Sequence, residues 1–167
     1  DMEAELIETR QHLHAHPELS FEETETAHYV AEKLESWGYE VTRNVGGHGV
    51  VARLTVGDSK KSIGIRADMD ALPLQEENQF AHRSQHAGRM HACGHDGHTT
   101  MLLAAAWYLS QHRDFAGTVH LIFQPAEEMG KAGARKMIED GLFERFPCDT
   151  VFALHNFALS KVGAFAL

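Results

Sequence analysis

Residues 90–99 read Met-His-Ala-Cys-Gly-His-Asp-Gly-His-Thr, and the apolar run Met-Leu-Leu-Ala-Ala-Ala-Trp follows at 101–107. The first stretch gathers a thiol, three imidazoles and a carboxylate, and the second predicts a helix over residues 98–110. Cys93 and His95 project to the same side if the stretch is extended, so both can bind one metal ion. Zn²⁺ and Mn²⁺ suit such donors. The stretch therefore predicts a metal-binding loop before a helix; a histidine-rich surface loop is the alternative.

Composition limits the class of protein. The chain has 167 residues, 43% of them hydrophobic and 23% charged, which predicts one globular domain of ordinary size. A net charge of −9 argues against a nucleic-acid partner, because phosphate binding needs basic patches. Every apolar run is shorter than the ~20 residues that span a bilayer, so no membrane partner is expected. Cys93 and Cys148 are the two cysteines, and so low a number predicts a reduced, cytoplasmic protein.

The first part of the chain predicts two helices and three strands. A helix is expected over residues 3–15, and Ser20 with Glu23 forms a capping box that opens a second helix ending near Gly38. Strands are expected at 39–43, 50–56 and 62–67. The short turn between the last two strands predicts that they are antiparallel neighbours.

The remaining chain continues to alternate helices and strands. A long irregular loop at 75–92 precedes the Cys/His stretch, and loops of this length are usually functional or disordered. Further elements are expected in the order strand 117–123, helix 133–139, strand 150–154 and a final strand 162–167. The fold class predicted is α/β, with a mixed, largely parallel sheet and helices on both faces.

Charged or metal-ligating residues follow three of the predicted strands: Asp68 and Asp70, Glu127 and Glu128, and His155. In open α/β sheets the ligand crevice lies beyond the carboxyl ends of the strands. The Cys93/His95 loop then only has to fold over that same edge, so these segments are expected to converge.

The chemistry of these residue types suits a metal site. Of the adjacent carboxylates Glu127 and Glu128, one can bind metal while its neighbour addresses a water molecule. One of Asp68 and Asp70 is expected to accept the N–H of a ligating histidine and so fix its tautomer. Taken singly, each has a simpler alternative: a solvated turn, an exposed strand end, or for His155 a core histidine bonded to backbone.

Five segments together resemble the M20 metallopeptidase/amidohydrolase family. They are His-Ala-His-Pro-Glu-Leu-Ser at 14–20, Arg-Ala-Asp-Met-Asp-Ala-Leu-Pro at 66–73, the stretch 91–99, Phe-Gln-Pro-Ala-Glu-Glu at 123–128 and Leu-His-Asn at 154–156. The Cys-Gly-His form is similar to the subgroup of hippurate hydrolases, N-acyl-amino-acid amidohydrolases and indole-acetyl-amino-acid hydrolases.

The resemblance implies a role for each matching position. It implies two divalent metal ions, Mn²⁺ or Zn²⁺ with Ni²⁺ and Co²⁺ as further options, held by Cys93, His95, Glu128 and His155. Glu127 matches the general acid/base, and Asp70 matches an aspartate beside the metals. Asp68 stands where many relatives have a ligating histidine, and His91 and His98 are expected to support the site from outside the ligand set.

The implied function is hydrolysis of the amide bond of an N-acyl or N-aroyl amino acid, a small-molecule substrate, by a protein that forms a homodimer or homotetramer. Family members are longer, with an inserted lid or dimerisation domain and a later histidine ligand. The resemblance thus implies that residues 1–167 are the N-terminal part of the catalytic domain, with weak metal binding and little activity alone.

Other functions stay open or are disfavoured. An inactive fragment and a mononuclear metal-binding module without catalysis are the alternatives to the enzyme. A zinc deaminase needs His-x-Glu followed by Pro-Cys-x-x-Cys, and neither occurs. A Cys93 nucleophile fits less well, because the neighbouring donors suit metal ligation better than a Cys–His pair.

Overall fold

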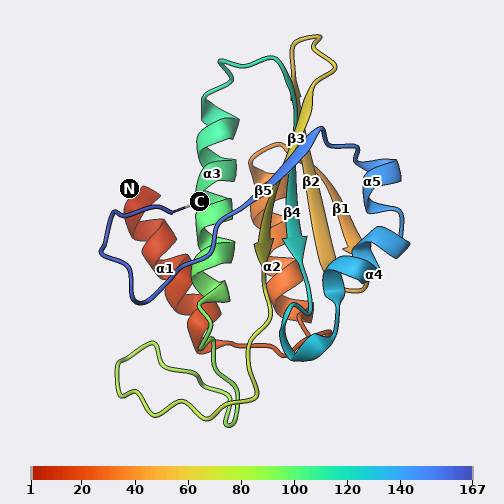
Figure 1. Cartoon of the computed structure of the whole chain (residues 1–167). Helices are drawn as coiled ribbons and strands as arrows, with labels where there is room; N and C mark the ends of the chain where they lie inside the picture. Colours follow the sequence, from red (N-terminus) through yellow and green to blue (C-terminus); the bar gives the residue numbers. More distant parts are fainter. Residues whose placement is uncertain (1, 167) are drawn as a thin grey trace.

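A mixed sheet of five strands carries helices on both faces in the computed structural model, which describes residues 2–166 (Figure 1). The strand order is β1-β2-β4-β3-β5. The elements, in chain order, are α1 (Met2–Ala15), α2 (Thr24–Ser36), β1 (Glu40–Val45), β2 (Gly49–Val56), β3 (Ser62–Asp68), α3 (His95–Gln111), β4 (Gly117–Gln124), the short 3₁₀ helix η1 (Glu128–Gly130), α4 (Gly133–Glu139), α5 (Leu142–Arg145) and β5 (Thr150–Ala153). The predicted α/β class and mixed sheet are confirmed, with two parallel and two antiparallel strand pairs.

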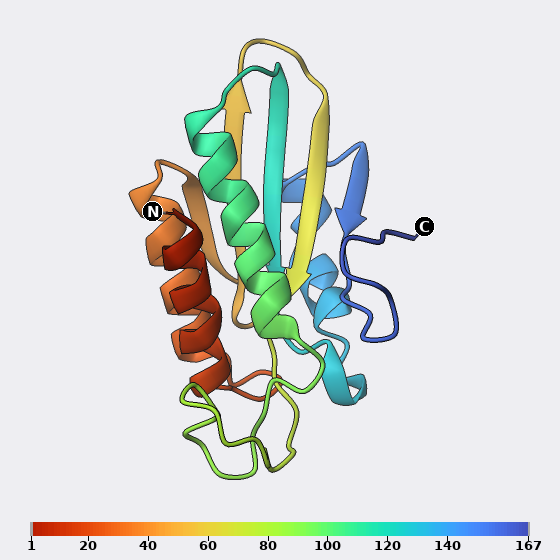
Figure 2. The same cartoon turned by 90° about the vertical axis from the view of Figure 1, so that its left-hand side faces the viewer.

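Both faces of the sheet are buried because side chains alternate along each strand. On β2, Val50, Ala52 and Leu54 belong to the larger core beneath α2 and α3. Val51 points the other way, into a smaller core that contains Met137 of α4. Figure 2 shows α1, α2 and α3 in front of the sheet and the short helices α4 and α5 behind it. The site described below is therefore built on a sheet supported from both sides.

The predicted antiparallel pairing of strands 50–56 and 62–67 is wrong, because β4 lies between them. β4 pairs antiparallel with β2 and parallel with β3. The connection at 57–61 has to cross only one intervening strand, about 10 Å, which five residues span easily. Leu121 and Phe123 of β4 are buried in the larger core, and Ile122, which points the other way, is buried in the smaller one. The central position thus goes to the strand whose side chains are buried on both faces.

The predicted capping box is also wrong, since α2 begins at Thr24. The carboxylate of Glu18 accepts the backbone N–H groups of residues 25–26, at 3.1 and 2.8 Å. A negative charge is stabilising there because the N-terminus of a helix has unpaired N–H groups and a positive dipole end. The Ser20 hydroxyl instead donates to Asp70, 2.7 Å away, inside the molecule.

The remaining boundaries differ in two places that matter. Helix α3 begins at His95, three residues earlier than predicted, because Gly94 adopts a left-handed conformation with φ of 88° and turns the chain into the helix. The final strand at 162–167 is wrong for the described residues, since 162–166 form turns and irregular backbone; residue 167 lies outside them. Within residues 2–166, every helix is too short or too polar to cross a membrane.

The long loop at 75–92 is irregular, as predicted, and is tied to α1 through His14. The two ring nitrogens of that buried histidine lie 2.7 Å from Asp96 and 3.0 Å from Glu76. The hydrogen bond to Asp96 is the main cause that raises the pKa of His14, with Glu76 adding to it. Because Asp96 lies in the first turn of α3, this network joins the loop, α1 and the Cys/His stretch.

Candidate metal centre

The sheet register brings the predicted site residues to one edge. Asp68 at the end of β3 lies opposite Gln124 at the end of the parallel strand β4. Ala153 of β5 pairs parallel with Arg66 of β3. The residues that follow β3, β4 and β5 consequently leave the sheet at the same edge, where Figure 1 also shows the start of α3.

His95 lies at the centre of this group, and its side chain is fully buried. Among residues 2–166, neither ring nitrogen has a hydrogen-bond partner. Nδ1 lies 3.3 Å from Asp70 Oδ1, close but poorly aligned. Nε2 faces three further carboxylate oxygens: Asp68 Oδ2 at 3.6 Å, Glu128 Oε1 at 3.8 Å and Glu127 Oε2 at 3.9 Å. Burial opposes protonation of this ring, yet the carboxylates outweigh it and raise the pKa of His95.

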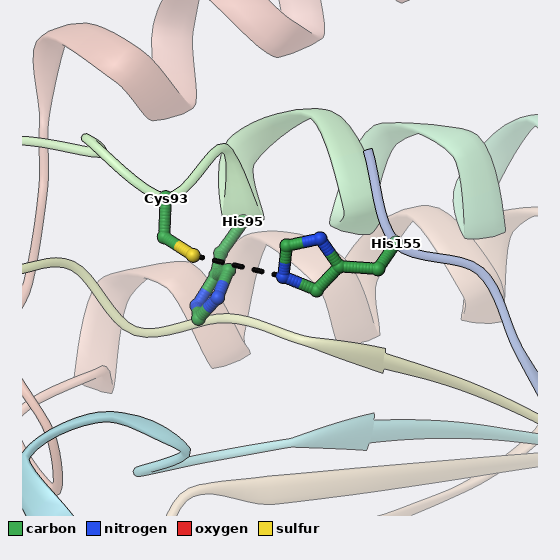
Figure 3. Close-up of side chains that lie close together, drawn as sticks. All are labelled: Cys93, His95 and His155. Carbon is green, nitrogen blue, oxygen red and sulfur yellow. Dashed lines mark hydrogen bonds between the residues drawn. The ribbon is translucent and has the colours of Figure 1, made fainter. Parts of the chain in front are cut away.

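Cys93 and His155 approach each other beside His95. Cys93 Sγ lies 3.6 Å from His155 Nε2, and Figure 3 shows the His95 ring next to the line that joins these atoms. His155 Nδ1 is 2.6 Å from the carbonyl oxygen of Asn156, to which it donates. That bond leaves Nε2 as the nitrogen with a free lone pair, directed toward the thiol.

These separations fit a metal ion. Ligand atoms on a tetrahedral Zn²⁺ lie about 3.4 Å apart for two nitrogen or oxygen donors and about 3.6 Å apart for sulfur and nitrogen, from bonds of about 2.1 and 2.3 Å. Two groups with ligand atoms within 4.8 Å of one another share His95: Cys93 with His155, and Glu127 with Glu128. A buried imidazole without a partner, surrounded by carboxylates, is an environment that a cation stabilises. The residues present therefore fit a divalent metal.

In a third group, Asp68 with His95 and His98, two of the three members already pair with each other. His98 Nδ1 donates to Asp68 Oδ1 at 2.6 Å, and Arg66 Nη1 lies 2.8 Å from Asp68 Oδ2. Burial opposes ionisation of Asp68, but the hydrogen bond from His98 and the charges of His95 and Arg66 lower its pKa to about 2. Asp68 is thus a buried anion whose strongest contacts are to His98 and Arg66.

The Cys93 thiol is a poor nucleophile in this setting. Burial raises its pKa to about 11, and the hydrogen bond and charge of Glu128 act in the same direction. A free thiol must ionise to attack, whereas a metal ion favours the thiolate. The alternative of a Cys93 nucleophile is therefore disfavoured by its surroundings.

The contacts by which some residues position the site could not be read from the sequence. The backbone N–H of Asn156 lies 3.1 Å from His98 Nε2, which holds the segment after β5 against α3. Glu23, read as part of a helix cap, is fully buried and contacts the turn before Glu127. A buried carboxylate of this kind is visible only once the fold is known, because its sequence pattern also fits a helix start.

A sequence profile of the peptidase family M20/M25/M40 matches residues 64–166, more than half of the chain. The chain belongs to this family. The match covers β3 from residue 64 onward, the Cys/His stretch, the Glu127–Glu128 turn and His155, which are the parts that form the site. The resemblance inferred from the five sequence segments is thereby confirmed.

Curated relatives carry names from the expected subgroup. The chain is 52% identical over 167 residues to the hippurate hydrolase of Campylobacter jejuni, and this match covers 100% of the chain and 43% of that protein. It is 46% identical over 156 residues to the N-acyl-L-amino acid amidohydrolase of Geobacillus stearothermophilus, and this match covers 93% of the chain and 42% of that protein. The chain thus spans less than half the length of these relatives.

Solved structures share the fold. A putative aminohydrolase from methicillin-resistant Staphylococcus aureus matches with a TM-score of 0.90 and 44% identity, over 95% of this chain and 42% of that one. The Bacillus subtilis YXEP protein, described as a dinuclear metal binding peptidase of the M20 family, matches with a TM-score of 0.87 and 42% identity. This match covers 92% of this chain and 43% of that one.

Proposed function

We propose that this chain carries the metal-binding part of a metal-dependent amidohydrolase that cleaves the amide bond of N-acyl or N-aroyl amino acids. The observation that carries the proposal is the buried, unpartnered imidazole of His95 between the Cys93/His155 pair and the Glu127/Glu128 turn. The names of the relatives that share 46% and 52% of its residues support this substrate class.

In this proposal, two divalent ions are held by Cys93, His95, Glu128 and His155. Mn²⁺ and Zn²⁺ are the first options, and Ni²⁺ and Co²⁺ suit the same donors. Bound divalent metal lowers the pKa of water and polarises a carbonyl group, which is the chemistry that amide hydrolysis needs. Asp70, 3.3 Å from His95 Nδ1, is the proposed acceptor of the N–H of that ring, which leaves Nε2 for the other donors.

Glu127 is the general acid/base. Its side chain is 44% exposed, against 18% for Glu128, so it can reach both water and a substrate. It accepts a proton from the attacking water and then donates it to the leaving amine. Glu128, the more buried neighbour, is the one proposed to bind metal.

We further propose that the chain forms the N-terminal part of the catalytic domain. An inserted domain and a later histidine ligand then complete the site in the full protein, which we expect to be a cytoplasmic homodimer or homotetramer. On this proposal the isolated chain has weak metal affinity and little activity, so tests of catalysis use the complete protein.

The test is hydrolysis of N-benzoylglycine by the complete protein, followed as released glycine, with metal content measured in parallel. We expect about two metal ions per chain, loss of activity with a chelator, and recovery on adding Mn²⁺ or Zn²⁺. Glu127→Gln is expected to lower kcat at least about 100-fold with metal retained. Glu139→Gln, on the exposed surface of α4, is the matched control and is expected to leave kcat unchanged.

Two outcomes contradict the proposal in different ways. A complete protein that binds metal but hydrolyses none of a panel of N-acyl and N-aroyl amino acids is a metal-binding module instead. A Glu127→Gln variant that keeps most of its kcat removes Glu127 from the general acid/base role while leaving the amidohydrolase assignment in place.

A further inference from the structure

Three consecutive backbone N–H groups at the turn after β4 are all accepted by buried carboxylates. Ala126 N donates to Glu23 Oε1 at 2.7 Å. Glu127 N and Glu128 N donate to the two oxygens of Asp70, each at 3.0 Å. The three N–H groups of the turn that carries the two adjacent glutamates are therefore all held by residues distant in sequence.

The turn needs such support because its backbone is strained. Ala126 has φ of 51° and Met129 has φ of 59°, in the left-handed region that residues with a Cβ rarely adopt. Strained backbone persists at functional sites only where the surroundings fix it. The hydrogen bond to Glu23 is made by the first strained residue, so it bears directly on the direction in which the next two side chains leave the chain.

The position of Glu23 before α2 does not explain why its carboxyl group is buried. Its side chain is fully buried, and among the described residues its Oε2 has no hydrogen-bond partner. Burial raises the pKa of this carboxyl to about 7, with the nearby charge of Asp70 adding to the effect. A buried carboxyl is costly, and this one makes a long-range hydrogen bond to the Ala126 N–H. The carbonyl oxygen of either protonation state can accept that N–H, so the contact itself does not depend on titration.

We propose that Glu23 is a positioning residue for Glu127 and Glu128. By accepting the Ala126 N–H it fixes the left-handed turn, while Asp70 fixes the following two residues, and together they set one glutamate toward the metal ligands and the other toward substrate. This inference rests on the proposed function. Glu23 touches neither reacting atoms nor metal ligands, so it acts only through the turn.

The test compares four variants of the complete protein. Glu23→Ala removes the acceptor, Glu23→Gln keeps an acceptor oxygen without the charge, and Glu23→Asp keeps the carboxylate but withdraws it from Ala126. Val30→Ala is the matched control, since Val30 is fully buried in α2, the helix that follows Glu23, and packs in the core instead of against the turn. If Glu23→Ala fails to fold, Glu23→Asp takes its place.

The first measurement is amide hydrogen exchange of Ala126 in the metal-free protein. Loss of one hydrogen bond predicts exchange about tenfold faster in Glu23→Ala, with Glu23→Gln within about threefold of wild type and Val30→Ala shifted only as much as global stability. The second is kinetics on N-benzoylglycine with bound metal. We expect kcat to fall about tenfold or more in Glu23→Ala with KM within about threefold, and most of kcat to return in Glu23→Gln.

Each result decides the matter. Unchanged exchange at Ala126 in Glu23→Ala overturns the positioning role, and so does a kcat equal to that of Val30→Ala at equal loss of stability. A wild-type protein that lacks amidohydrolase activity counts against the proposed function alone. In that case faster exchange at Ala126, with a changed absorption spectrum of bound Co²⁺, still supports positioning of the turn by Glu23.

Discussion

Gly94 offers the sharpest test of how the metal centre is assembled, because it stands between Cys93 and His95 in a left-handed conformation. Its φ is 88°, and a Cβ built there would lie 2.8 and 2.9 Å from the side-chain amide of Asn156. Gly88 is the natural control. It has φ of 73°, but a Cβ there meets nothing within 4 Å in the described part of the chain.

The two substitutions therefore share one cost and differ in another. An alanine in the left-handed region costs about 1–2 kcal/mol at either position. At Gly94 the new Cβ must also displace the side-chain amide of Asn156, which lies against His98 Nε2, and weakening the contacts of Asn156 with His98 costs about 1 kcal/mol more. We expect Gly88→Ala to lose about 1–2 kcal/mol of unfolding free energy and Gly94→Ala about 2–3 kcal/mol.

Metal affinity should separate the two variants more strongly than stability does. Displacing Asn156 should also move the adjacent His155 away from Cys93. In the unsubstituted protein, His155 Nε2 lies 3.6 Å from Cys93 Sγ. Disturbing groups that orient metal ligands costs about 10–100-fold in affinity, and we expect a loss in this range for Gly94→Ala. Gly88→Ala should retain the wild-type affinity.

Urea unfolding of the metal-free chain gives the first quantity, and competition against a chromophoric Zn²⁺ chelator in the complete protein gives the second. Equal affinities for the two variants would refute the reasoning, because they would mean that Asn156 and His155 do not depend on the space that Gly94 leaves. A stability loss at Gly94 no larger than that at Gly88 would refute the steric part alone.

Two further predictions concern groups with shifted pKa values. Because the pKa of Cys93 is about 11, its alkylation by iodoacetamide in metal-free protein should be about 100-fold slower at pH 8 than that of an unperturbed thiol. The alkylation rate, followed by mass spectrometry, should keep rising up to about pH 11. A rate that levels off near pH 9 contradicts this. The pKa of Asp68 is lowered from 3.8 to about 2, so its stabilisation is complete above pH 3.8 and is lost as pH falls through 2. The difference in unfolding free energy between wild type and Asp68→Asn, from urea titrations, should narrow by about 2 kcal/mol between pH 6 and pH 2, and a constant difference would show that Asp68 is not the anion described.

Local patterns predicted the elements of this fold well, because most of them depend on neighbours in sequence. The helix at 133–139 has the predicted bounds, and strand β4 is one residue longer than predicted. The short turn between β2 and β3 could not show that β4 lies between these two strands. Which strand lies at the centre of a sheet depends on burial on both faces, and that is decided by the helices that cover them.

The site shows the same division between local and distant information. The convergence of residues 68–70, 127–128 and 155 followed from the rule that ligands bind at the carboxyl ends of parallel strands. The contacts of Ser20 and Glu23 could not be predicted in this way, because the sequence pattern of these two residues also fits a capping box. Glu18 accepts the N–H groups at the start of the helix instead, and the side chains of Ser20 and Glu23 bond to groups inside the molecule.

The proposed division of roles between Glu127 and Glu128, in proton transfer and in metal binding, depends on a property that neither residue holds by itself. The two are chemically identical neighbours, yet one side chain is 44% exposed and the other 18%. Their difference arises from the backbone of the turn, whose N–H groups are accepted by Asp70, 57 and 58 residues earlier, and by Glu23, 103 residues before Ala126. A substitution at either acceptor should consequently alter metal binding and proton transfer together, whereas a substitution at one glutamate should alter only one of them.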